Sequence, residues 1–207
     1  MKLRQIIHAI FLVCALLGMV TAAQAEDADP ARMLVYISPQ DYEHSIKLWH
    51  YYYNYWYEQG PAVEPVAMEM LSVEYGDVKM CQGNNLGKAL VWIKPRMYYN
   101  PQLEVFYGEI TANIFSGNGK VLGTYTGDSR KHGFLDVYPE RQVEAAYKLA
   151  MQNLMLKIKA DQALQTKINE SVAGNETSSC ALVALLPPAR ANDVKHYFQS
   201  PGYINEH

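Results

Sequence analysis

Three residues with the chemistry of a nucleophilic triad, Asp128, Ser129 and His132, lie close together in the sequence. In a triad the histidine accepts the serine proton and the acid orients the histidine, so the three side chains must converge from separate elements. Here they share one short segment, which we interpret as an ordinary polar loop.

Glu104 and Glu109 lie an odd number of residues apart on one expected strand. They therefore point to opposite faces and cannot by themselves form the carboxylate pair of a glycosidase.

The chain has three cysteines, and two of them, Cys81 and Cys180, lie beyond the N-terminal apolar segment. An even pair in an oxidising compartment is more often bridged than free, so the sequence predicts a disulfide. The alternative is two buried thiols. Redox chemistry would need a local Cys-x-x-Cys pair, which is absent. Phosphate loops, dinucleotide fingerprints and zinc-ligand spacings are also absent from the sequence, so we expect no catalytic, cofactor-binding or metal-binding residues.

Tyrosine is frequent, with 16 in the chain, and aromatic residues concentrate between residues 42 and 57. Ser38 followed by a proline is a good helix start, and Gly60-Pro61 is a strong stop, which together predict a helix from Ser38 to about Gln59. Residues three and four apart form its expected buried stripe: Tyr42, Ile46, Trp49, Tyr53 and Trp56. The remaining tyrosines lie at its sides: Tyr51, Tyr52, Tyr55 and Tyr57. They are either an interaction surface or part of a helix wedged between other elements.

The N-terminus has the anatomy of a secretory signal peptide. Lys2 and Arg4 precede an apolar run over residues 6–20, and a small-x-small signal ends at Ala25. The run is shorter than the roughly 20 residues that span a bilayer, so we expect cleavage near Ala25 and a periplasmic or secreted mature chain. Cys14 lies inside the run without small residues before it, so we expect no lipid anchor. We also expect no membrane span in the mature chain.

Hydrophobic periodicity predicts the other elements. Strands are expected at 33–37, 63–75, 88–94, 103–115 and 120–126, the last two joined by a hairpin turn. A loop at 127–137 leads to a second helix, which starts at Pro139 and continues past a bend near Asp161. The run 180–186 is either an extra strand or a segment held by the disulfide.

This order, β-α-β-β-β-β-α, predicts an α+β fold: an antiparallel sheet of four to five strands with two main helices on one face. The expected organisation is a signal peptide at 1–25, a flexible leader at 26–32, one domain at 33–186 and a loosely held tail at 187–207. The strand Gly-Lys-Val-Leu-Gly-Thr-Tyr at 119–125 leads through a polar loop into a helix. The pattern over residues 33–160 resembles small accessory proteins of the bacterial cell envelope, namely auxiliary subunits of lipid-transport and lipopolysaccharide-assembly systems. Most of these carry a lipidated N-terminal cysteine, which this chain lacks.

The formal net charge is −3, and the sequence has no basic cluster, which argues against nucleic-acid binding. The leading hypothesis is a noncatalytic periplasmic accessory or binding protein with an envelope protein or glycan as partner. One alternative is a secreted hydrolase of wall glycan or peptide, with Trp49 and Trp56 stacking on sugar and Glu109 or Asp128 as the acid. Another is a carrier of small apolar ligands, suggested by four methionines: Met68, Met70, Met151 and Met155.

Overall fold

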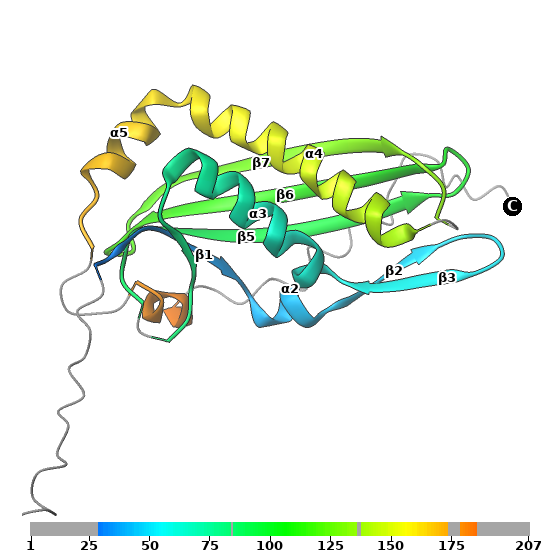
Figure 1. Ribbon diagram of the computed structural model, residues 1–207, viewed down its shortest axis with the longest axis horizontal. Helices are drawn as coiled ribbons and strands as arrows, with labels where there is room; N and C mark the ends of the chain where they lie inside the picture. Colours follow the sequence, from blue (N-terminus) through cyan, green and yellow to red (C-terminus); the bar gives the residue numbers. More distant parts are fainter. Residues whose placement is uncertain (1–28, 84, 136–137, 174–178, 186–207) are drawn as a thin grey trace, which may run out of the picture.

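The computed structural model describes residues 29–83, 85–135, 138–173 and 179–185. The expected signal peptide, its cleavage site near Ala25 and the tail at 187–207 lie outside these ranges. Within them the α+β class is confirmed, with a five-stranded sheet, a separate two-stranded hairpin, and helices that pack on the larger sheet (Figure 1).

The main sheet has the strand order β4-β1-β5-β6-β7. Its strands are β1 (Ala31–Ile37), β4 (Val78–Met80), β5 (Gly87–Asn100), β6 (Val105–Ser116) and β7 (Val121–His132). The last three form the expected antiparallel meander, but β1 runs parallel to both of its neighbours, so the expectation of a purely antiparallel sheet is wrong. The cause is a helical crossover after β1, which returns the chain to the end of the sheet where β1 began.

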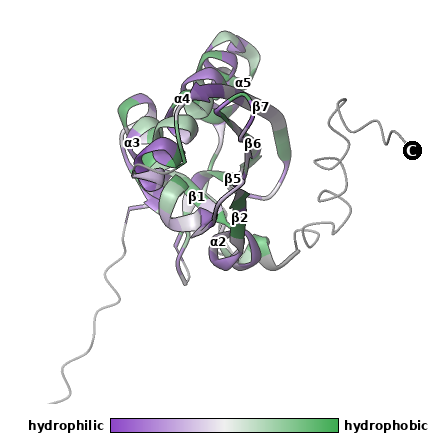
Figure 2. Ribbon diagram, turned by 90° about the vertical axis from the view of Figure 1, so that its right-hand side faces the viewer, coloured by the Kyte–Doolittle hydropathy of each residue, from purple (hydrophilic) through white to green (hydrophobic). Residues whose placement is uncertain are grey.

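Two long helices, α3 (Gln59–Tyr75) and α4 (Pro139–Ala160), cover one face of this sheet, as Figure 2 shows from the end of the molecule. Two main helices on one face were expected, although α3 is not the helix that the sequence predicted. A glycine lets α4 approach the sheet closely, because a Cβ on Gly127 of β7 would lie 2.2 Å from the carbonyl oxygen of Ala150. The expected bend at Asp161 is present, and the Asp161 side chain caps the next helix, α5 (Gln162–Glu170).

The predicted helix from Ser38 to Gln59 is wrong after its first turn. Ser38 does cap a helix, α2 (Pro39–Glu43), but the chain then forms a hairpin of β2 (Ser45–Trp49) and β3 (Asn54–Glu58). Aromatic residues favour strands, and the inward-facing side chains here alternate with a period of two. The tip, Tyr51-Tyr52, contains none of the glycine or asparagine residues that usually identify a hairpin turn.

The predicted strand at 63–75 is also wrong, because these residues belong to α3. The buried side chains of α3 recur every three or four residues, which is the helical period: Val63, Val66, Ala67, Leu71 and Tyr75. Pro61, interpreted as part of a helix stop, lies in the first turn of α3, where a backbone N–H has no helical partner in any case. Pro95 lies within β5, two residues beyond Ile93, the last residue paired with β1, so among the described residues β5 has no strand partner on that side there.

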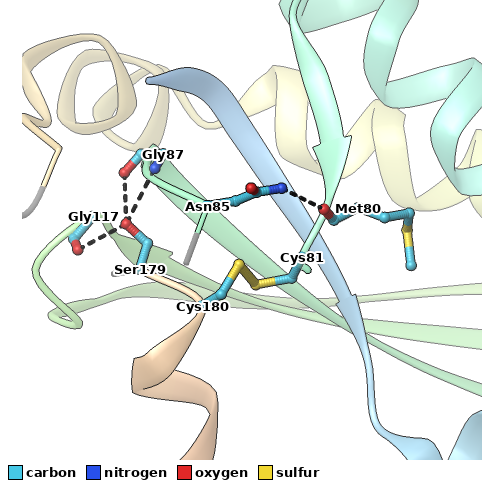
Figure 3. Close-up of a disulfide and its surroundings, with 7 residues drawn as sticks. All are labelled: Met80, Cys81, Asn85, Gly87, Gly117, Ser179 and Cys180. Carbon is cyan, nitrogen blue, oxygen red and sulfur yellow. Dashed lines mark hydrogen bonds between the residues drawn. A yellow bond between two sulfur atoms is a disulfide. The ribbon is translucent and has the colours of Figure 1, made fainter. Parts of the chain in front are cut away.

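The face of the sheet opposite the helices carries a small second cluster, formed by Ala31, Leu34, Leu90, Trp92 and Phe115. Cys180 and Val183 pack against this cluster. Val183 belongs to a short 3₁₀ helix, η1 (Ala181–Leu185), and Cys180 comes directly before it. The Cys81–Cys180 disulfide is present, with Cα atoms 5.5 Å apart, and Figure 3 shows it beside the buried Ser179. The Ser179 hydroxyl accepts a hydrogen bond from the Gly87 N–H at 3.2 Å. Of the two alternatives for this run, the described residues 180–185 form the segment held by the disulfide, and residue 186 lies outside the described ranges.

Candidate functional site

The β2–β3 hairpin lies at the end of the molecule opposite η1 (Figure 1). Its register pairs Lys47 with Trp56 and Trp49 with Asn54, so these four side chains share the outer face of the hairpin. Trp49 is 45% exposed and Trp56 is 59% exposed, although the sequence analysis placed both in a buried stripe. The prediction failed because it assumed helical spacing, whereas successive side chains of a strand point to opposite faces.

The four tyrosines of the expected interaction surface divide into two pairs. Tyr51 and Tyr52 lie at the hairpin tip and are 54% and 88% exposed. Tyr55 and Tyr57 lie on the inner face, half-buried against the core, with stacked rings whose centroids are 6.2 Å apart. The exposed aromatic side chains of the hairpin are therefore Trp49, Tyr51, Tyr52 and Trp56, which we call the aromatic arm.

A groove of about 440 Å³ lies between β3, the start of α3 and the first turns of α4. Three aromatic residues of β3 line it: Tyr55 and Tyr57, whose rings lie on the inner face of the hairpin, and Trp56, whose side chain lies on the outer face. Its acidic residues are Glu58 at the end of β3 and Glu140 and Glu144 at the start of α4. Sequence reasoning did not identify Glu140 or Glu144 as site residues, because no local pattern shows that α4 begins beside the hairpin.

The phenol of Tyr55 connects the aromatic and acidic sides of the groove. Its pKa is raised to about 12, first by burial and then by a hydrogen bond to Glu140, with the charges of Glu140 and Glu144 adding to the effect. A phenol with this pKa stays protonated at neutral pH. Tyr55 is therefore a neutral phenol beside the two carboxylates of α4.

A second set of hydrogen bonds fixes the floor of the site. The Tyr147 hydroxyl of α4 donates to the Gln59 side-chain oxygen at 3.0 Å and lies 3.2 Å from the Tyr57 hydroxyl. Tyr147 is fully buried and Gln59 almost so. Buried polar groups are costly unless they are satisfied, so these bonds set the relative positions of β3, α3 and α4.

The three groove carboxylates differ from the other acids on this side of the molecule. Between α3 and α4, Glu69 pairs with Lys148 at 3.3 Å and Glu74 pairs with Lys159. Within the described ranges, by contrast, Glu58, Glu140 and Glu144 form no ion pair. The groove therefore carries negative charge that the described part of the chain does not neutralise locally.

The structure separates the residues of the apparent triad. Ser129 is buried in β7 and donates to the Ala146 carbonyl oxygen at 2.7 Å, while its neighbour Asp128 is exposed and pairs with Lys157 at 3.5 Å. His132 ends the same strand, so the expected loop at 127–137 is β-strand as far as His132. These three residues are not arranged as a triad.

The acids named for the hydrolase alternative lie away from the groove. Glu109 on β6 pairs in register with Asp128 on β7 and forms an ion pair with Arg96 at 3.7 Å. Trp56 lines the groove, but the acids beside it are those of α4 and of the end of β3.

The methionines named for an apolar ligand divide between core and periphery. Met151 and Met155 of α4 are buried among core side chains, and Met68 and Met70 pack partly buried against them. They serve the packing of helices on the sheet. Among the residues that the structure describes, no group of His, Cys, Asp or Glu could hold a metal ion. No helix in the described ranges is long and apolar enough to cross a membrane.

No protein-family model matches the chain, and neither does any curated protein. Among solved structures, a DUF330 protein from Xanthomonas campestris matches with 12% identity and a TM-score of 0.41, over 68% of this chain and 88% of that chain. The PelC dodecamer from Paraburkholderia phytofirmans matches with 12% identity and a TM-score of 0.37, over 60% of this chain and 89% of that chain. These similarities assign neither a family nor a function to the chain.

Proposed function

We propose that this chain is an exported, noncatalytic binding protein of the bacterial cell envelope, and that it contacts its partner through the aromatic arm. The carrying observation is the hairpin itself, a two-stranded unit outside the main sheet with four large exposed rings. Tyrosine and tryptophan are enriched at protein interfaces, because each gives a large contact area with a polar tip at a small cost in side-chain entropy.

Two independent features support export. The sequence begins with the charged, apolar and small-residue regions of a signal peptide. The Cys81–Cys180 disulfide joins residues that are 99 positions apart, and such bonds persist in oxidising compartments such as the periplasm. N-terminal sequencing of the native protein from a periplasmic fraction is expected to begin near Glu26.

Site-specific photo-crosslinking in intact cells tests the role of the aromatic arm. A photoreactive residue at Tyr52 is expected to trap a discrete envelope partner. The matched control is Val73, which is 83% exposed on α3 and lies outside the arm. Equal yields at both positions, or no adduct from Tyr52, would contradict the proposal.

A hydrolase remains the second candidate, because carboxylates do lie beside aromatic rings in the groove. In this form Glu140 and Glu144 replace the acids that the sequence analysis named. Release of soluble fragments from purified cell wall by the wild-type chain, abolished by Glu144→Gln, would favour it over the binding protein. The proposed function expects no release from either chain.

A further inference from the structure

We infer that the groove between β3 and α4 binds a lysine or arginine side chain presented by an extended segment of a partner protein. This inference rests on the proposed function and names the chemistry of the partner. It is carried by charge complementarity, by the aromatic wall and by the free edge of β3.

Charge is the first argument. Glu58, Glu140 and Glu144 come from two elements and line one groove, and the side chains that line it include no Lys, Arg or His. Glu140 and Glu144 are four residues apart on α4, where like charges repel. The helix N-terminus offsets this repulsion for Glu140 but much less for Glu144 in the next turn. A bound cation would neutralise both.

Three cations on elements that border the groove have contacts of their own elsewhere. The Lys47 ammonium lies 5.8 Å from the centre of the Trp56 ring, on the outer face of the hairpin. The Arg141 guanidinium stacks over Tyr138, 4.7 Å from the ring centre. Lys148 pairs with Glu69, between α3 and α4. Neither Lys47 nor Arg141 forms an ion pair with a groove carboxylate.

The aromatic wall is the second argument. Lysine and arginine have apolar stems and cationic heads, and aromatic faces attract such heads. The inner-face rings of Tyr55 and Tyr57 line the same groove as the carboxylates. Tyr55 and Glu140 line the same groove, so a ring and a carboxylate lie together there. Aromatic rings beside carboxylates suit a basic side chain better than a neutral sugar, which would leave the charge uncompensated.

The edge of β3 is the third argument, and it favours a peptide. Within the described ranges β3 pairs with β2 only. His50 N–H donates to the Tyr53 carbonyl at 3.1 Å, and hydrogen-bonded pairs alternate along an antiparallel ladder. The register therefore turns the N–H and C=O of Trp56 away from β2, toward the edge without a strand. An extended segment can pair with such an edge while its side chains enter neighbouring pockets.

Isothermal titration of the oxidised mature chain tests the inference directly. The probe is a short peptide of alternating arginine and threonine, compared with a glutamate–threonine peptide of the same length. The arginine peptide is expected to bind, and its Kd is expected to rise about fivefold with Glu140→Gln or Glu144→Gln. The binding should also weaken as salt is added, because the carboxylates are exposed. Glu170→Gln, an equal charge change at the end of α5, is the matched control and should leave the Kd unchanged.

Two further ligands separate a peptide from a free polyamine. An arginine–threonine peptide with alternate backbone nitrogens methylated is expected to lose most of its affinity, because it cannot pair with β3. Spermidine is expected to bind at least tenfold more weakly than the arginine peptide.

Three outcomes would overturn the inference: equal binding of the acidic peptide, an unchanged Kd in both groove variants, or spermidine binding as tight as peptide binding. Each of these leaves the proposed function standing if Tyr52 still traps an envelope partner. Loss of the Tyr52 adduct would instead remove the proposed function itself.

Discussion

Replacing both bridging cysteines, Cys81→Ser with Cys180→Ser, should lower the free energy of unfolding by several kcal/mol. The disulfide closes a loop between residues 99 positions apart. For a loop of roughly 100 residues, the chain-entropy model gives about 4.7 kcal/mol, through greater freedom of the unfolded chain. In the variant, residues 179–185 are held in place only by noncovalent contacts. The native state can therefore also gain conformational entropy, which would reduce the loss of stability.

Those contacts set how much of the effect remains. Ser179 bonds with Gly87, and Val183 packs against the cluster that contains Trp92. If the segment stays in place, the loss should approach the full loop term. If it detaches, the native state also gains entropy and the loss should fall toward about 2 kcal/mol, the lower end of the usual range.

Urea unfolding measures the loss, and tryptophan fluorescence in the native state measures detachment. Trp92 is 6% exposed, so release of the segment should make it more accessible to acrylamide. Ser179→Ala in the oxidised chain is the control, because it removes the hydroxyl contacts but keeps the covalent link. A loss below about 1 kcal/mol with Trp92 still shielded would refute the reasoning, since neither the loop term nor detachment would account for it.

Three further changes test other contacts. Tyr147→Phe should cost about 1–3 kcal/mol in urea unfolding, because it leaves the buried Gln59 oxygen without its donor. Gly127→Ala should cost about 1–3 kcal/mol, because the added methyl meets the backbone of α4. The Tyr125 hydroxyl donates to Asp161 at 2.6 Å, and burial and this bond raise the pKa of Tyr125 from 10.0 to about 12. This hydrogen bond therefore stabilises the fold below pH 10, and the stabilisation should be lost as the pH rises from 10 to 12. The Tyr125→Phe variant should not show this loss. The same hydrogen bond lowers the pKa of Asp161 below 3.8. Its stabilising effect should therefore be lost when the pH falls far enough to protonate the carboxyl of the folded state. The Asp161→Asn variant should not show this acid dependence.

Local signals predicted local structure well. Ser38 caps a helix as expected, with its hydroxyl oxygen 3.1 Å from the Asp41 N–H, and Pro139 begins one. The sequence could not show that the first of these helices ends at Glu43, because the aromatic residues that follow have both a helical and a strand-like spacing. The strand forms instead of a helix because it packs Tyr55 and Tyr57 against the core.

The groove was beyond sequence reasoning for a different reason. It forms where β3 meets the start of α4, and about 80 intervening residues, which form α3 and four strands of the main sheet, bring Glu58 to Glu140 and Glu144. No spacing rule connects positions that far apart. The disulfide was predictable because it depends on residue count and compartment, whereas its place behind the sheet required the fold.

The position of β1 determines how the molecule would respond to mechanical tension. β1 lies between β4 and β5 and runs parallel to both, so it is hydrogen-bonded along both sides. A pull on the chain before Ala31 would act along the strand and strain these bonds simultaneously, instead of opening them one at a time as at a peeled edge. A tether joined at this end would therefore load the pairing of β1 with β4 and with β5 at the same time.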